Sequence, residues 1–195
     1  MIIREYRDGD NLQWVRCRVL SFLDSSYFDN VLREKETYSN PSIELVAEVD
    51  NKIIGFIDIE YERKIGEVCH KTNELGGVIW HLGVLPEYRR LGVAALLLSE
   101  GINNLKRKGI KKLQAWTRDD KWVNDWYKAK GFIWKESYLH VYAEDVECDK
   151  AVQPMIKKLY IYSTFAHYMG EDREFIKESF KRVHECNLYE LDIEG

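Results

Sequence analysis

The 195-residue chain lacks the marks of secreted, membrane-spanning and metal-binding proteins. Its four cysteines, Cys17, Cys69, Cys148 and Cys186, lie far apart and form no CxxC or Cys/His ligand pair. We therefore expect four reduced thiols and no metal site. The N-terminus carries no apolar run as long as a signal peptide or a membrane anchor, which favours a cytoplasmic protein with no membrane partner.

A strong charge of either sign is also missing. The 29 Lys and Arg residues and the 33 Asp and Glu residues give a formal net charge of -4. Attraction to phosphate backbones needs a basic surface, so we expect no nucleic-acid partner. The sequence contains no internal repeat, low-complexity tract or linker. Its hydrophobic fraction of 45% is sufficient for a folded core.

Apolar periodicity alternates between strand and helix along the chain. Strands are predicted over residues 2–6, 42–49, 52–61, 75–85, 112–117, 132–142, 159–168 and 188–193. Helices are predicted over residues 12–22, 26–38, 91–108, 122–130 and 171–185. The long apolar run of residues 75–85 indicates a central strand that is buried on both faces. This order of elements predicts an α/β fold.

Residues 78–98 form a strand–turn–helix that suits a phosphate ligand. The strand ends at residues 84–86, the turn carries Arg89 and Arg90, and the helix opens with residues 92–94. A helix N-terminus presents unpaired backbone N–H groups and the positive end of the helix dipole. Small residues there let a ligand reach these amides, and the arginines add charge-assisted hydrogen bonds. The pattern therefore predicts a phosphate or pyrophosphate site.

Two motifs resemble signatures of the GNAT N-acetyltransferase superfamily. The pattern Arg89-x-x-Gly92-x-Ala94, directly after a strand, is similar to the acetyl-CoA-binding motif of that family. The run Trp-Tyr-x-x-x-Gly-Phe that ends at Phe132 is similar to its second signature. The resemblance covers roughly residues 1–143. It implies an α/β (α+β) fold with a central mixed, mostly antiparallel sheet flanked by helices.

The C-terminal part departs from the minimal family pattern. We predict a GNAT-like domain over residues 1–149 and a strand–helix–strand extension over residues 150–195, packed on or completing the same domain. The extension could complete the sheet, cover an acceptor cleft or form a homodimer interface, and we favour sheet completion. The sequence-clustered tryptophans are interpreted as core and interface packing rather than as a stacking surface for substrate; they are Trp116, Trp122, Trp126 and Trp134.

The resemblance also implies roles for individual residues. The backbone of Leu82, Gly83 and Val84 would pair with the pantetheine arm of CoA. Tyr127 would protonate the leaving thiolate, and Asn124, one turn earlier, would contact the cofactor, although the family's usual asparagine lies further upstream. The pyrophosphate would be wrapped by the turn and the first helical residues, namely Arg89, Arg90, Leu91, Gly92, Val93, Ala94 and Ala95.

Two residues are candidates for the general base. Some family members use a glutamate on the central strand, but Val78 stands near the corresponding place. His81 on the same strand has a suitable intrinsic pKa, and a buried structural histidine is the alternative. Glu60 could relay a proton through water. It belongs to a row with Asp58 and Glu62 that period-two spacing places on one face, which we interpret as the solvated face of the sheet.

These features predict an acetyl-CoA-dependent N-acetyltransferase that transfers the acetyl group to a primary amine by direct attack. The acceptor, a small molecule or a peptide, is left open among polyamines, antibiotics, amino acids and protein N-termini. The absent strand carboxylate motivates an alternative, a catalytically inactive CoA-binding sensor or interaction module. A longer acyl chain in place of acetyl is a third hypothesis.

Overall fold

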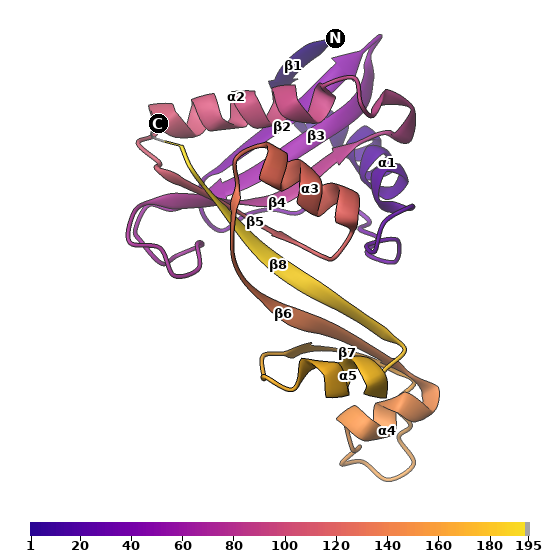
Figure 1. Ribbon diagram of the computed structural model, residues 1–195. Coiled ribbons are helices and arrows are strands. Elements are labelled where there is room, and N and C mark those ends of the chain that lie inside the picture. Colours follow the sequence, from indigo (N-terminus) through magenta and orange to yellow (C-terminus); the bar gives the residue numbers. More distant parts are fainter. Residues whose placement is uncertain (194–195) are drawn as a thin grey trace.

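The computed structural model describes residues 1–193, which form a mixed sheet with helices on both faces (Figure 1). The strands are β1 (Ile2–Glu5), β2 (Ser42–Val49), β3 (Lys52–Tyr61), β4 (Gly76–Val84), β5 (Lys112–Thr117), β6 (Ile133–Glu144), β7 (Ser163–Tyr168) and β8 (Arg182–Asp192). The α-helices are α1 (Asn11–Phe22), α2 (Val93–Arg107), α3 (Lys121–Ala129), α4 (Cys148–Ala151) and α5 (Arg173–Ser179). Across residues 1–193, no helix is both long enough and apolar enough to cross a membrane.

The sheet runs in the order β1-β2-β3-β4-β5-β8-β6-β7, and β4 and β5 are its parallel pair. The remaining described neighbours pair antiparallel. The predicted mixed, mostly antiparallel sheet flanked by helices is therefore confirmed.

Two apolar clusters lie on opposite faces of β3. Phe56 packs with Trp14 and Cys17 of α1 in one cluster. Ile57 packs with Leu97 of α2 in the other. Because successive side chains of a strand point to opposite faces, this alternation buries the strand between α1 and α2. The two faces are thus closed by different helices, and the ends of those helices meet near the end of β4.

The strands β4 and β5 separate part of the way along their length. They pair only from Gly76 to Ile79 of β4, whereas β4 continues to Val84 alongside β3. The pairing of β3 with β4 also slips by one residue beside Asp58, which leaves Trp80 without a partner in the register. The backbone of β4 beyond the slip is therefore open on its β5 side.

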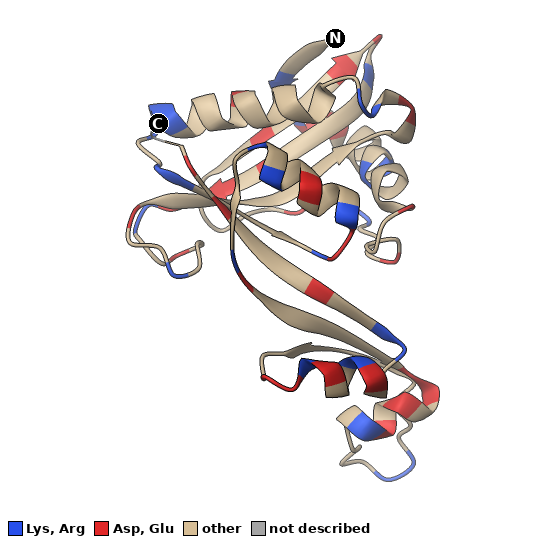
Figure 2. Cartoon of the chain, viewed as in Figure 1, with Lys and Arg blue, Asp and Glu red and all other residues tan. Residues whose placement is uncertain are grey.

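The C-terminal part of the chain extends the sheet and then leaves the main body. Strand β8 lies between β5 and β6 and pairs antiparallel with both. The long ribbon of β6 and β8 carries β7, α4 and α5 away from the rest of the molecule (Figure 1). Figure 2 shows Lys, Arg, Asp and Glu interspersed on α4 and α5. The division of the chain into domains at residue 149 stays a prediction.

Two predicted helices are wrong or too long. Residues 26–38 form turns and bends instead of a helix. Hydrogen bonds to distant strands and turns hold this segment, since Ser26 donates to Asp120 and the backbone N–H of Arg118 donates to Tyr27. The helix predicted over residues 171–185 ends at Ser179. The residues from position 182 onward belong to β8, where ladder pairing with β6 outweighs local helix propensity.

The interpretation of the acidic row as a solvated face is also wrong. Asp58, Glu60 and Glu62 are 0%, 7% and 2% exposed. The carboxylate of Glu62 accepts hydrogen bonds from the backbone N–H groups of Gly66, Val68, Cys69 and Gly76. The loops before β2 and after β3 cover this face, and they provide the donors that a buried carboxylate requires.

Candidate active site

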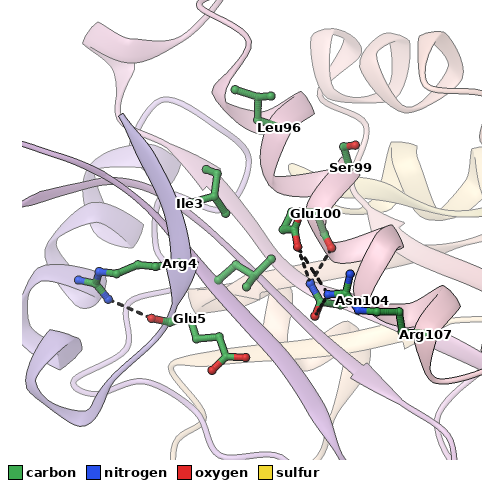
Figure 3. A pocket seen from close by; sticks show the side chains of 9 residues that line it. Ile3, Arg4, Glu5, Leu96, Ser99, Glu100, Asn104 and Arg107 are labelled. Carbon is green, nitrogen blue, oxygen red and sulfur yellow. Dashed lines mark hydrogen bonds and ion pairs between the residues drawn. The ribbon is translucent and has the colours of Figure 1, made fainter.

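A cavity of about 800 Å³ opens where β4 leaves β5. Residues of α1, β4, β5, α3 and the start of α2 line it. A smaller cavity of about 360 Å³ lies between β1 and α2 (Figure 3). Its polar side chains already bind one another, since Asn104 donates to Glu100 and Arg107 donates to Asn104. The larger cavity is therefore the candidate site.

The start of α2 forms one end of this cavity. Gly92 precedes the helix with φ +84°, a left-handed conformation that favours glycine. A Cβ added at Gly92 would meet nothing within 4 Å, so the space beside it is open. The first N–H groups of a helix have no partner within the helix, and here Val93, Ala94 and Ala95 line the cavity. This end fits a phosphate or pyrophosphate group.

The two arginines of the turn differ in their surroundings. Arg89 binds Asp24 at 2.6 and 2.8 Å and donates to the carbonyl of Ser21, so it fastens the end of α1 to the turn. Arg90 also lines the cavity but is exposed, and its side chain contacts no hydrogen-bond or ion-pair partner within the described chain. It is the cation that is available to an anion here. Leu91 is 68% exposed and does not line the cavity.

Strand β4 forms the long wall. Leu82, Gly83 and Val84 all line the cavity. Their backbone lies beyond the pairing with β5, on the side where the two strands have separated. Backbone N–H and C=O groups at such an open edge can pair with an extended ligand that carries amide groups. The structure thus brings these three residues together with the start of α2.

Tyr127 lies deep on the opposite wall. Its ring contacts Phe132 and Trp126 edge-on and stacks on Tyr189 at 5.9 Å between centroids. Burial raises the pKa of its hydroxyl, which therefore stays protonated at neutral pH. The hydroxyl makes no side-chain hydrogen bond to another residue in the part of the chain that the structure describes. A protonated hydroxyl whose O–H group is not donated to another side chain is suited to donate to a leaving group.

Asn124 is near this wall but does not line the cavity. Its Nδ2 donates to the carbonyls of Arg118 and Asp120 at 2.7 and 2.9 Å. Its Oδ1 accepts from the hydroxyl of Tyr189 at 3.0 Å. The side-chain amide is thus occupied in holding the turn before α3 to β8.

His81 faces the cavity between two polar neighbours. Its Nε2 lies 2.7 Å from a carboxylate oxygen of Glu36, and Nε of Arg18 donates to its Nδ1 at 3.5 Å. The carboxylate therefore favours the tautomer with the proton on Nε2, which leaves the lone pair on Nδ1. Burial lowers the pKa of His81, so the ring is neutral at pH 7. A neutral imidazole of this kind can accept a proton.

Glu60 does not line the cavity, but it binds Trp80, which does. Its carboxylate accepts from the backbone N–H of Asn40 at 2.8 Å and from Nε1 of Trp80 at 2.8 Å. Trp80 lines the cavity, whereas Glu60 does not. The carboxylate therefore fixes the orientation of the Trp80 indole.

Several lining residues are absent from the site predicted from sequence. They are Arg18, Ser21, Phe22, Tyr27, Trp80 and Trp116, among others. Of these residues, Arg18 could have been found from the sequence. It falls on the buried stripe of α1 with Trp14, Cys17 and Ser21, where a cation is unexpected. The partnership of His81 with Glu36 was hidden because residues 26–38 were predicted to be helical.

Comparisons with known proteins agree with this geometry. The family model described as Acetyltransferase (GNAT) family matches residues 9–132. An acetyltransferase of Sodalis glossinidius (strain morsitans) is 30% identical over 124 residues, which cover 62% of this chain and 78% of that protein.

Solved structures share the fold. An acetyltransferase of the GNAT family from Streptococcus pneumoniae has a TM-score of 0.61 at 15% identity, with 98% of each chain covered. The PaiA N-acetyltransferase of Thermoplasma acidophilum, solved in complex with coenzyme A, has a TM-score of 0.52 at 16% identity, over 69% of this chain and 90% of that one.

The segment matched by the family model contains both sequence motifs and the whole lining of the larger cavity, which runs from Arg18 to Lys130. The resemblance stated from the sequence is therefore confirmed. The chain belongs to the acetyltransferase (GNAT) family and is an acyltransferase.

Proposed function

We propose that the protein transfers the acetyl group of acetyl-CoA to a primary amine by direct attack of the amine on the thioester. The observation that carries this proposal is the start of α2. There, an open glycine turn, unpaired helix N–H groups and the free cation Arg90 meet at one end of a cavity that also contains His81 and Tyr127. The family to which the chain belongs, and a neighbour solved with coenzyme A, support the choice of co-substrate.

The residues that would hold acetyl-CoA follow from the two walls. Backbone N–H groups of Val93, Ala94 and Ala95, with Arg90, would bind the pyrophosphate. The open edge of β4 at residues 82–84 would pair with the pantetheine arm. Acetyl-CoA supplies an activated thioester carbonyl, and the protein positions it beside the acceptor amine.

His81 is proposed as the general base. The amine attacks the thioester carbonyl carbon, a C–N bond forms and the C–S bond breaks. The acceptor amine replaces the 3.5 Å hydrogen bond that Nε of Arg18 donates to Nδ1 of His81. The amine proton then goes to this lone pair on Nδ1, because the lowered pKa of His81 keeps the ring neutral. Glu36 on Nε2 holds the ring in the required tautomer and stabilises the imidazolium that forms.

Tyr127 is proposed as the general acid. The departing thiolate takes the hydroxyl proton of Tyr127 and leaves as the CoA thiol. The raised pKa means that the hydroxyl carries its proton at neutral pH. After the thiol leaves, the phenolate of Tyr127 regains a proton from solvent and the imidazolium of His81 releases one, which restores both groups. Proton donation of this kind contributes roughly 10²–10⁴-fold to rate.

The proposal is tested by incubating the protein with acetyl-CoA and a panel of primary amines, with the release of CoA thiol as the readout. We expect release to depend on an amine and to fall when Tyr127 is replaced by Phe. Acetyl-CoA binding without thiol release on any amine would instead support the CoA-binding module without transferase activity. Parallel assays with propionyl- and succinyl-CoA compare the acyl chains.

A further inference from the structure

Arg18 is a buried guanidinium that lines the cavity beside His81 and has no carboxylate partner. The residue is 2% exposed and lines the cavity. Nη1 and Nη2 donate to the backbone carbonyl and to Oδ1 of Asn30 at 2.5 and 3.2 Å, and Nε donates to His81. Within residues 1–193, no carboxylate lies within ion-pair distance of this guanidinium. Each terminal nitrogen keeps one N–H group for a ligand.

Other arginines of the protein are paired with carboxylates or surrounded by other partners. Arg4, Arg89 and Arg182 each bind a carboxylate at 2.5 or 2.6 Å, although they are less buried than Arg18. Arg118 is also buried without an ion pair, but Ser26, Tyr142 and His140 surround its guanidinium and it does not line the cavity. A buried cation is costly unless it is paired, so Arg18 is placed to receive an anion from the cavity.

The short distance between Arg18 and His81 limits the kinds of anionic ligand that can also place an amine on His81. Nε of Arg18 lies 3.5 Å from Nδ1 of His81, the atom proposed to take the proton of the acceptor amine. An anionic group on Arg18 and an amine on His81 must therefore sit close together on one molecule. In an α-amino acid, the amine and the carboxylate are attached to the same carbon. We propose that the acceptor is an α-amino acid whose carboxylate binds Arg18; this inference rests on the proposed function.

The charges around the cavity disfavour the polycationic acceptors left open by the sequence. The ionisable lining residues are Arg18, Asp24, Arg89, Arg90, Asp120 and Lys130 together with His81 and the tyrosines. Both carboxylates are already engaged, Asp24 by Arg89 and Asp120 by Ser26. Arg89 is paired with Asp24 and Arg90 is assigned to the pyrophosphate, so Arg18 and Lys130 are the lining cations left to face an acceptor. Their charges disfavour polyamines and polycationic antibiotics.

The remaining walls indicate the side chain of the amino acid. Phe22, Tyr27, Trp80 and Trp116 also line the cavity, and the Arg18 guanidinium lies over the ring of Phe22 at 4.9 Å. The indole of Trp80 is half-exposed and held by Glu60. Aromatic walls with few free polar groups favour an apolar or aromatic side chain. Leucine and phenylalanine are thus suitable probes, and the products are the N-acetyl amino acid and CoA.

The test compares each amino acid with two analogues that lack the carboxylate. Phenylalanine is assayed against phenylalaninamide and phenethylamine, and leucine against leucinamide and isoamylamine, with CoA release as the readout. The values of kcat/KM are expressed per unprotonated amine, because the amine pKa differs within each set. We expect the amino acids to exceed their analogues by at least tenfold, since charge-assisted hydrogen bonds to Arg18 are lost with the carboxylate.

A substitution then assigns the preference to Arg18. In Arg18→Gln, we expect the ratio of kcat/KM for phenylalanine over phenethylamine to fall to near unity. Arg16→Gln, on the exposed side of the same helix, should retain the wild-type ratio. Equal values for acid, amide and amine in the wild type would overturn the amino-acid acceptor while leaving the transferase function intact. Release on other primary amines but on none of these six compounds would also overturn the amino-acid acceptor. Binding of acetyl-CoA without release on any primary amine would overturn the transferase function, and this inference with it.

Discussion

Tyr127 combines deep burial with a place in the cavity lining. We expect Tyr127→Phe to lower kcat by about 10²-fold, because the leaving thiolate loses its proton donor. The affinity for acetyl-CoA should change little, since the ring and its packing on Phe132 and Tyr189 are kept. Steady-state kinetics with titration of acetyl-CoA separate the two effects.

A matched control is Tyr61→Phe, which removes a hydroxyl from a core residue outside the cavity lining. It should leave kcat unchanged. An unchanged kcat in Tyr127→Phe, or an equal loss in both variants, would contradict the role of Tyr127 as the acid.

His81 should set the acid limb of the pH–rate profile. Burial lowers its pKa below the usual value of 6.5, and the proposed base works only when neutral. The rate should therefore fall as pH decreases through this lowered pKa. We expect His81→Gln to lower kcat/KM by about 10²-fold and to remove this limb. A variant profile that keeps the same limb would show that another group titrates.

Local pattern predicted part of this site. The residues of the start of α2 and the end of β4 belong to one continuous strand–turn–helix, so a motif of adjacent positions was enough to find them. Arg18 and Glu36 meet His81 only through tertiary contacts, which no spacing in the sequence displays. Asn124 is assigned to the cofactor from its place one turn before Tyr127. Its Oδ1 instead accepts from Tyr189 of β8, which lies 65 positions away and which no local pattern indicates.

At the scale of elements, segments with strong apolar periodicity are predicted correctly, whereas a polar segment is not. The helix predicted over residues 91–108 and the strand predicted over residues 75–85 match α2 and β4, because burial of one face or of both faces dictates the apolar pattern. Residues 26–38 have a helix-like composition, but side chains such as Tyr38, which donates to Asp58, hold the segment against the sheet. Tertiary contacts of this kind override intrinsic propensity.

The packing of this segment on β3 has a consequence for stability. Asp58 is fully buried, and burial raises its pKa from 3.8 to about 7, with Lys35 at 3.5 Å opposing the shift. The folded state thus holds the proton more tightly than the unfolded state. The stabilisation is complete below about pH 4 and is lost as pH rises through about 7.

We expect Asp58→Asn to remove this loss. The free energy of unfolding of the variant, relative to wild type, should increase by up to about 4 kcal/mol between pH 4 and pH 8. Urea denaturation at the two pH values measures it. Asp50→Asn, on the exposed turn between β2 and β3, is the control and should follow the wild type. A parallel pH dependence of Asp58→Asn and wild type would contradict the raised pKa.

At the scale of the whole molecule, the distal part formed by β7, α4 and α5 lies apart from the region that contains the cavity. The cavity lining ends at Lys130, and β7, α4 and α5 contact β6, β8 and one another. This part displays Met155, Tyr160 and Tyr162 with 98%, 89% and 76% exposure. A homodimer through this part stays a prediction.

Removal of this distal part should spare the cofactor site. Tyr142 of β6 pairs with Arg182 of β8, so an Asn-Gly turn can replace residues 143–181 as a two-residue hairpin. We expect the shortened chain to bind acetyl-CoA within about threefold of the full chain, because burial and hydrogen bonding at the site are untouched. Calorimetry checks the affinity, and circular dichroism checks the fold. A folded but non-binding product would mean that the distal part supports the site.

The central claim is that acetyl-CoA binds through its pyrophosphate at the start of α2. Isothermal titration of wild type, Gly92→Ala and Gly109→Ala with acetyl-CoA tests it most directly. Both glycines have positive φ and open space around them, so either substitution should cost about 1 kcal/mol of stability. We expect a micromolar Kd for wild type and Gly109→Ala, and at least tenfold weaker binding for Gly92→Ala. No binding by wild type at millimolar acetyl-CoA, or equal affinity in all three proteins, would contradict the account.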